Sequence, residues 1–281
     1  MSSILTNNSA MVALQTLKSI NGDLSKTQSM ISTGKEISSA KDNSALWAIS
    51  KVMESDVAGF KAISDSLSLG ESTIAVASAG AEQIVETLKE MKQLAISAQS
   101  ENVDFTKIQA DLDEKAAQVA SIIGASQFNG ANLLATDVDG NGGTSLNILS
   151  SLDRVGTAAP TPTLISVGSV DFEANVDLAT NLTAITDTTT AATALGELEA
   201  FLTTAIDGAA ALGASGKRVN DQNTFVGKLS DALKSGIGAM VDADMEEASA
   251  RLQALQVQQQ LGVQSLSIAN QAPQTILSLF R

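Results

Sequence analysis

The amino-acid sequence predicts a mainly α fold, in which long antiparallel heptad helices form a bundle with a small central β-containing excursion and paired N- and C-terminal helices. Apolar residues recur every seven positions over two long stretches, one in each half of the chain. The segment between them is rich in Gly and Thr and alternates apolar with polar residues. Aromatic residues make up only 3% of the 281 residues. That content favours close packing of helices through small side chains over a thick globular core.

The first segment predicts an amphipathic helix, because its apolar residues are spaced by threes, fours and sevens. These residues are Ile4, Met11, Leu14, Leu17, Leu24 and Ile31. Gly34 then interrupts the pattern, and the polar run over 38–44 predicts a non-helical connector. We place Trp47, the only tryptophan, in this connector, where it either packs into a core or anchors the connector.

From Phe60 onward the heptad spacing is strict and continues to Ala98. One seam is formed by Phe60, Leu67, Ile74, Ala81, Leu88 and Ala95, and the other by Ile63, Gly70, Ala77, Ile84, Met91 and Ala98. A helix over 60–98 would be ~58 Å long. A second helix is expected after it, with Asp104 or Thr106 as its N-cap and the Asn129-Gly130 turn beyond its end.

The segment 131–190 predicts short strands joined by turns. Leu146 and Ile148 alternate with polar neighbours, and a second alternation runs from Val170 to Leu178. Two of the three prolines and a cluster of glycines also fall in this segment. We therefore expect a small β-containing excursion between the two helical halves.

Heptads return in the second half and predict another long helix. Its seam is Leu198, Ala205, Leu212, Val219, Val226, Leu233 and Met240. A terminal helix follows, with Leu252, Leu255 and Leu266 among its apolar residues, and Pro273 is expected to end it. The last residues are apolar again, with Ile276, Leu277, Leu279 and Phe280.

These patterns divide the chain into three parts. The predicted terminal helical domain comprises 1–42 and 241–281, the helical bundle comprises 43–130 and 191–240, and 131–190 forms the excursion. The terminal helices carry too few apolar residues for a thick core, and isolated helices gain little stability without a packing partner. Their apolar stripes therefore cover either the rest of the same chain or other copies of it.

Composition excludes several classes of function. The chain has no His and no Cys, which removes Ser–His and Cys–His catalysis, disulfides and the common zinc sites. A net charge of −14 argues against binding nucleic acid. No apolar run reaches the ~20 residues of a membrane span, and the first residues lack the features of a cleavable signal. We predict a non-enzymatic protein with no catalytic residue and no cofactor. We expect it in the cytoplasm, or outside the cell by a route that needs no such signal.

Three runs of sequence resemble the bacterial flagellins. SMISTGKEISSAKDNSALWAIS over 29–50 is similar to the family's LSSGxRINSAxDDAAxxAIS, although Lys35 replaces Arg and Asn43 replaces Asp. SQFNGANLL over 126–134 is similar to QFNGxxLL. NQAPQTILSLFR over 270–281 follows the flagellin ending NQxPQxVLSLLR almost residue for residue.

The resemblance implies a structural subunit that self-assembles into the helical flagellar filament for swimming. It places the polymer interface on the terminal helices, at Ile4, Met11, Leu14, Leu17, Leu24, Ile31, Leu252, Leu255, Leu266, Ile276, Leu277, Leu279 and Phe280. It makes 131–190 the variable, outward-facing segment, and it implies a location in the extracellular filament. The implied partners are other copies of the chain, the flagellar type III export apparatus, a secretion chaperone, and the hook-associated junction and cap proteins. The alternatives are the hook–filament junction protein and a coiled-coil adaptor.

One short motif points to a metal. Asp137, Asp139 and Asn141, followed by Gly142, match the first half of a calcium loop. The twelfth position of such a loop needs a bidentate Glu, and here it is Ile148. The alternative is a turn between strands, closed by Asn and Gly.

Overall fold

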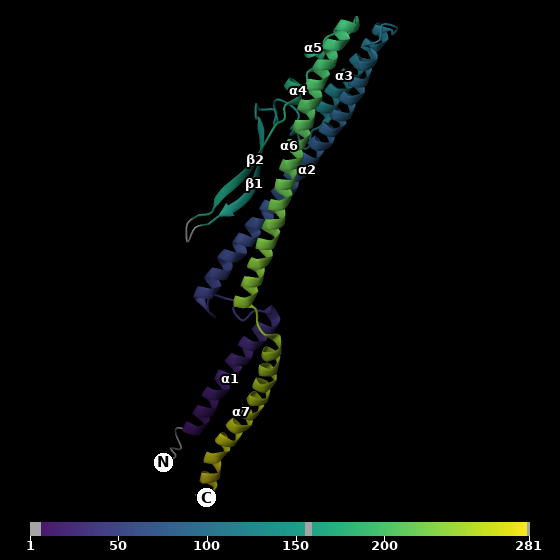
Figure 1. Cartoon of the computed structure of the whole chain (residues 1–281). Coiled ribbons are helices and arrows are strands. Elements are labelled where there is room, and N and C mark those ends of the chain that lie inside the picture. Colours follow the sequence, from purple (N-terminus) through teal and green to yellow (C-terminus); the bar gives the residue numbers. More distant parts are fainter. Residues whose placement is uncertain (1–6, 155–158, 280–281) are drawn as a thin grey trace. The chain divides into compact units, whose positions relative to one another are not determined.

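The computed structural model describes residues 7–154 and 159–279, with side chains up to Gln271 (Figure 1). The elements are α1 (Asn8–Thr33), α2 (Ser44–Ser97), α3 (Phe105–Ala125), β1 (Ser145–Asp153), β2 (Thr161–Gly168), α4 (Phe172–Asn175), α5 (Leu178–Asn181), α6 (Thr188–Val241) and α7 (Met245–Leu279). They form two compact units. The terminal unit comprises Met1–Val57 and Ala232–Arg281, and the bundle unit comprises Ala58–Asp231.

The bundle unit is built on the two predicted α2 seams. Every residue of both seams is buried, from Phe60 at 9% exposure to Ala95 and Ala98 at 0%. The α6 seam is buried from Leu198 to Val226. The predicted fold class, mainly helical with long heptad helices, is confirmed.

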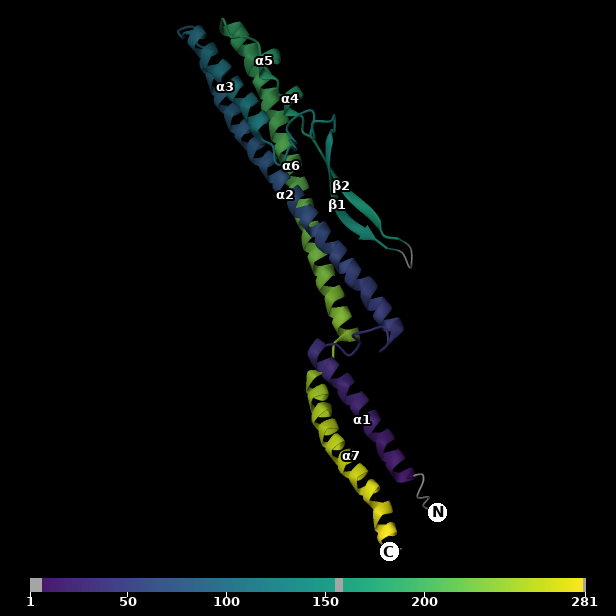
Figure 2. The same cartoon turned by 180° about the vertical axis from the view of Figure 1, so that it is seen from behind.

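Polar contacts fix the direction of α6 along α2. Ser64 Oγ lies 2.7 Å from Asn223 Oδ1, and Asn220 Nδ2 donates to Glu71 Oε1 at 2.8 Å. Farther along α2, Lys92 forms an ion pair with Glu199. Because the α6 residue number falls as the α2 number rises, the two helices are antiparallel, as Figures 1 and 2 show.

Helix α3 completes the bundle beside α2. Asp104 caps its start, because the Asp104 carboxylate accepts the N–H of Lys107 at 3.3 Å. Lys115 on α3 pairs with Glu90 on α2 at 2.5 Å. The helix ends at Ala125, just before the predicted turn, where Asn129 takes a positive φ of 50°. Both predicted boundaries of α3 are therefore confirmed.

A two-stranded antiparallel hairpin, β1 and β2, forms the excursion with α4 and α5. Its apolar side chains Ile148, Ile165 and Val167 are buried. The register shifts between Leu149 and Ser151, and the carbonyl of Ser150 there accepts the Nε2–H of Gln222 on α6 at 2.9 Å. The irregularity thus supplies a polar contact between hairpin and bundle.

The prediction of strand over Val170–Leu178 is wrong. Two short helices, α4 and α5, lie there instead, because Asp171 and Asp177 each accept a backbone N–H and start a helical turn. Phe172 and Val176, four positions apart, are buried on the same helical face. Residues that alternate with a period of two are also spaced by four, which is a helical spacing, so the same pattern fits both a strand and a helix.

The terminal helix also differs from prediction. It continues through Pro273 to Leu279. A proline removes one N–H and clashes with the carbonyl four residues back, but the turns on either side of it keep their own hydrogen bonds.

Glycines in the long helices make room for side chains of the excursion. A Cβ at Gly208 on α6 would lie 2.5 Å from Cζ of the buried Phe172, and a Cβ at Gly70 on α2 would overlap Ile148. Gly208 and Gly70 are therefore places where α4 and the hairpin approach the bundle closely.

Gly208→Ala should lower the free energy of unfolding by ~1–3 kcal/mol, because the added methyl group overpacks against Phe172. A Cβ at Gly213, on the same helix, would have no neighbouring atom within 4 Å. Gly213→Ala should therefore stabilise the helix by ~0.5–1 kcal/mol. Urea unfolding followed by circular dichroism measures both. Equal effects of the two changes would show that Phe172 does not occupy this space.

Candidate assembly surface

Helices α1 and α7 pair side by side within the terminal unit (Figures 1 and 2). Asn7 caps α1 by accepting the N–H of Ala10, and Gly34 ends it at a φ of 69°, a conformation that favours glycine. Asn7 Nδ2 donates to the Ala269 carbonyl at 2.7 Å, and Gln259 Nε2 donates to Asn21 Oδ1 at 2.7 Å. These contacts make the pair antiparallel.

The residues between α1 and α7 form a heptad seam of mostly half-buried side chains. On α1 they are Ala10, Ala13, Leu17, Ile20, Leu24, Thr27 and Ile31, and on α7 they are Ala248, Leu252, Leu255, Gln259, Gly262, Leu266 and Ala269. Among the described residues of the two helices, only Thr27, Ala248 and Leu255 are fully buried. The core of this pair is therefore thin.

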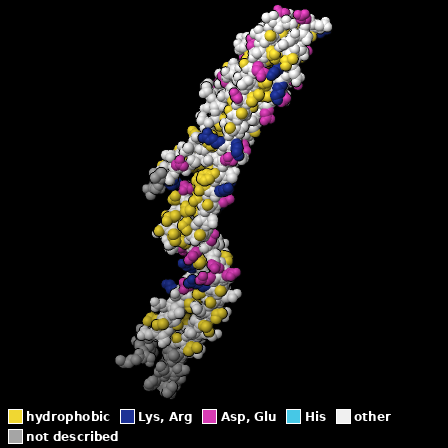
Figure 3. Space-filling model, in the orientation of Figure 1, with side chains coloured by type: hydrophobic (Ala, Val, Ile, Leu, Met, Phe, Trp, Pro, Cys, Tyr) yellow, Lys and Arg dark blue, Asp and Glu magenta, His cyan; other side chains and the backbone are white. Residues whose placement is uncertain are grey.

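A second set of apolar side chains lies outside this seam and is open to solvent. On α1 these are Met11, Val12 and Leu14, and on α7 they are Val257, Leu261, Val263 and Ile268, with exposures between 53% and 69%. Figure 3 shows hydrophobic atoms at the surface of this pair. We call these seven residues the open apolar set.

The residues predicted as a polymer interface divide into three groups. Leu17, Leu24, Ile31, Leu252, Leu255 and Leu266 face the seam within the pair. Met11 and Leu14 belong to the open apolar set. Ile4 and the side chains of Ile276, Leu277, Leu279 and Phe280 lie outside the described residues. The other five members of the open apolar set, Val12, Val257, Leu261, Val263 and Ile268, were not among the predicted residues. In the sequence each is an apolar residue off the heptad seam.

The connector after α1 is held by backbone pairing to the segment before α7. The Glu36 N–H donates to the Val241 carbonyl at 2.8 Å, and the Ala243 N–H donates to the Gly34 carbonyl at 2.9 Å. Lys35 in the connector lies 3.3 Å from Glu54 on α2, and Lys51 lies 2.5 Å from the same carboxylate. The non-helical connector is thus confirmed, and its first residues contact both the segment before α7 and the first turns of α2.

The placement of Trp47 in the connector is wrong. Asn43 Oδ1 accepts the N–H groups of Ala45 and Leu46, so α2 begins at Ser44 and Trp47 lies in its first turn. The Trp47 side chain is half-buried. Because Glu54 follows it by two helical turns, the two residues lie on the same side of α2.

The Asp137–Gly143 segment has the hydrogen bonds of a turn. The Asp139 carboxylate accepts the N–H groups of Asn141 at 2.9 Å and Gly143 at 3.0 Å, which lower the pKa of Asp139. Within the described ranges, no group of three or more acidic residues is arranged to hold a metal ion. No described helix is long and apolar enough to cross a membrane.

The fold and the open apolar set define a class of protein: a helical structural subunit whose paired terminal helices expose apolar residues. The chain matches the N-terminal helical region of bacterial flagellin over residues 4–138 and the C-terminal helical region over 198–280. It is 40% identical to flagellin FljM of Caulobacter vibrioides, over all of this chain and 99% of that protein. It is 41% identical to a flagellin of Brucella melitensis over the full length of both, and 33% identical to flagellin A of Rhizobium meliloti, also over the full length of both.

The chain belongs to the bacterial flagellin family. It is a structural subunit of the flagellar filament, as its resemblance to the flagellins predicts. These matches give no support to the hook–filament junction protein. The family is one of structural proteins that polymerise, and its members form the extracellular flagellar filament.

The Lys35–Glu54–Lys51 contact predicts an acid-sensitive connector. The ammonium groups of Lys51 and Lys35 hold the pKa of Glu54 below its ordinary value of 4.5. The contact therefore stabilises the fold above about pH 4.5, and this stabilisation is lost as the pH falls through the lowered pKa. Trp47 fluorescence of the monomer should change over that range in the native chain, and Glu54→Gln should remove the transition. Glu36→Gln, at an exposed position of the same connector, should keep it; loss of the transition in both variants would contradict the assignment.

Proposed function

We propose that the open apolar set of α1 and α7 is the surface through which copies of this flagellin assemble. One observation carries the proposal: a pair of helices with a thin core exposes seven apolar residues beside its own seam. Exposed apolar side chains that gather on one pair of helices can mark a protein–protein interaction site. Contacts that join different surfaces of neighbouring copies, and do not close into a ring, generate a helical filament.

This proposal assigns separate tasks to the two sides of the terminal helices. Leu17, Leu24 and Leu255 hold the pair together within one chain, whereas Met11, Leu261 and Ile268 meet other copies. We assign both sides to a terminal assembly domain over 1–42 and 241–281. We assign 43–130 and 191–240 to the helical bundle, and 131–190 to the variable, outward-facing segment.

We further propose that the chain leaves the cell through the flagellar type III apparatus, with a secretion chaperone covering its apolar terminal residues before assembly. The thin core of the α1–α7 pair supports this route, because such a pair costs little to open. The absence of Cys supports it too, since no disulfide needs to form or break in transit. In the finished flagellum the junction and cap proteins would contact the same terminal domain.

Polar substitution in the open apolar set should block assembly without unfolding the monomer. Ile268 is 69% exposed, so Ile268→Ser should change the free energy of unfolding by less than ~0.5 kcal/mol. It should still prevent elongation from filament seeds, measured by light scattering and electron microscopy. Gln264→Ser, at an exposed polar position of the same helix, is the control and should elongate normally. Normal elongation by Ile268→Ser would refute its role in the interface.

Removing the residues after Asn270 should abolish polymerisation, because this deletes the last apolar residues of the terminal domain. The truncated chain should keep the bundle unit, measured as a circular dichroism spectrum with the helical content expected for its length. Filaments formed by the truncated chain in the presence of seeds would exclude this end from the assembly mechanism.

A further inference from the structure

The net negative charge of the chain lies almost entirely in the bundle unit. The terminal unit has eight Lys and Arg against nine Asp and Glu, whereas the bundle unit has nine against 22. Within the bundle unit, residues 71–144 and 169–207 hold 18 of these acidic residues and only four basic ones. The remainder, which includes the hairpin packed on Gly59 and Gly70, has five basic and four acidic residues. One end of the bundle unit is therefore strongly acidic and the other is slightly basic.

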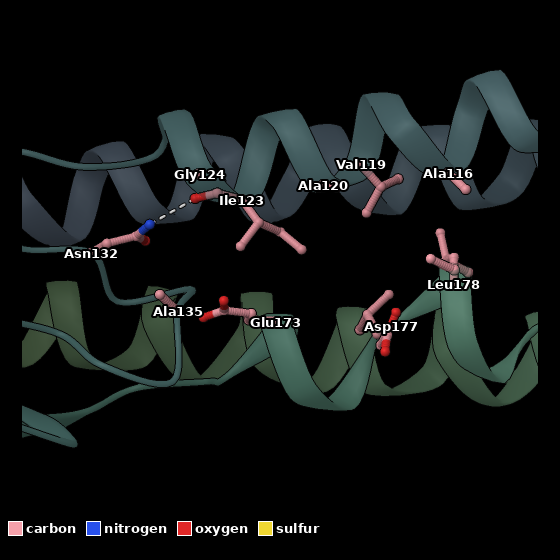
Figure 4. Close-up of a pocket in the computed structure, with 12 residues that line it drawn as sticks. Ala116, Val119, Ala120, Ile123, Gly124, Asn132, Ala135, Glu173, Asp177 and Leu178 are labelled. Atoms are coloured by element: carbon pink, nitrogen blue, oxygen red, sulfur yellow. Dashed lines mark hydrogen bonds between the residues drawn. The ribbon is translucent and has the colours of Figure 1, made fainter. Parts of the chain in front are cut away.

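A groove of about 390 Å³ opens in the acidic part, between α3 and the α4–α5 segment (Figure 4). The small residues Ala116, Ala120 and Gly124 form its α3 side, and the buried side chains of Val119 and Ile123 face into it. Glu173 and Asp177 form the opposite wall. The groove thus combines an apolar floor with an acidic wall.

The carboxylates of this wall are only partly engaged. Glu173 Oε2 accepts the N–H of Thr136 at 3.1 Å, and Asp177 Oδ1 accepts the N–H of Thr180 at 3.2 Å. Neither takes part in the salt bridges found among the described residues. A ligand for this groove would therefore bring an apolar group and a positive charge together.

The less acidic end of the same unit presents such a group. Phe225 on α6 is 57% exposed, although the chain has only seven phenylalanines. Arg218 and Lys228 are exposed seven residues before and three residues after it, so both flank its ring on the helix surface. We call Phe225, Arg218 and Lys228 the basic knob.

We propose that the basic knob of one copy docks in the groove between α3 and α4–α5 of a neighbouring copy. The proposal rests on the assembly proposed above and adds a second contact, within the bundle unit. Shape and charge both fit, because an aromatic ring would cover the apolar floor while the two cations face Glu173 and Asp177. The contact joins two different surfaces and so repeats from copy to copy.

The fold fixes the offset that this contact requires. The groove is level with Gly208 of α6, since Phe172 of α4 packs on that glycine. From Gly208 to Phe225 along α6 is about 25 Å at ~1.5 Å per residue. The two engaged copies are therefore displaced by about 25 Å along the bundle axis, and the knob of a chain does not reach its own groove.

Charge reversal tests the pairing. Lys228→Glu and Glu173→Lys should each raise, by about tenfold, the monomer concentration that remains in equilibrium with filaments, because like charges then face each other. The chain carrying both changes should return to within about twofold of the native value. Lys61→Glu, an exposed cation outside the knob, is the matched control and should not rescue Glu173→Lys. Urea unfolding of each monomer checks that the variants fold.

The double charge reversal distinguishes a wrong contact from a wrong assembly. If the native chain polymerises and the double reversal is no better than the single changes, the knob does not meet the groove. If the native chain does not polymerise with seeds, the proposed assembly itself is wrong.

Cross-linking tests the same contact independently, because the native chain has no Cys. A chain with Ala120→Cys and Asp221→Cys places one thiol in the groove and one beside Phe225. Disulfides form only when Cα atoms approach within ~7 Å, so oxidised filaments should give a ladder of covalent oligomers and oxidised monomer should not. A chain with Ala120→Cys and Lys61→Cys should give no ladder. An equal ladder from both chains, or none from the first, would overturn the proposal.

Discussion

The antiparallel seam between α2 and α6 is the interaction on which the rest of the bundle unit depends. Many of its positions are Ala or Gly, so the two helices approach closely and contribute contact along a great length rather than in a thick layer. Glycines of the same two helices also leave room for the excursion. Phe172 packs on Gly208 and Ile148 packs on Gly70, so these glycines let α4 and the hairpin approach the bundle.

The terminal unit uses the same heptad geometry with less burial. The seam of α1 and α7 contains Gly262, Gln259 and Thr27, where a stable isolated coiled coil would carry larger apolar residues. Polar contacts such as Gln259 to Asn21 fix the direction of the pair but add little apolar area. Apolar residues such as Met11 and Leu261 lie outside the seam instead and are exposed. A weak internal seam and a strong external surface are what a subunit needs if it completes its fold during assembly.

The sequence predicted the long helices well because heptad periodicity is repeated many times and each repeat reports on the same seam. It failed where a local side chain decides the structure. Asp171 and Asp177 turn an alternating pattern into helices, and Asn43 starts α2 before Trp47. The predicted interface mixed residues of the inner seam, such as Leu17, with open ones, such as Met11, because a helical stripe of threes and fours spans both. Periodicity places a residue on a helix face, but only the neighbouring helix determines which part of that face is covered.

The distribution of charge differs between the open apolar set of the terminal unit and the groove and basic knob of the bundle unit. The terminal unit is almost neutral, so copies can pack there through apolar contacts without strong repulsion. The bundle unit carries nearly the whole net negative charge, and like-charged bundles side by side would repel one another over the ~8 Å Debye length of physiological salt. The staggered contact proposed above would lessen that repulsion, because it would set the slightly basic end of one bundle against the acidic groove of the next. If copies were packed level with each other, Glu173 and Asp177 would face the acidic residues of their neighbours. The distribution of charge along the bundle therefore favours an offset arrangement of the kind that builds a helix rather than a flat ring.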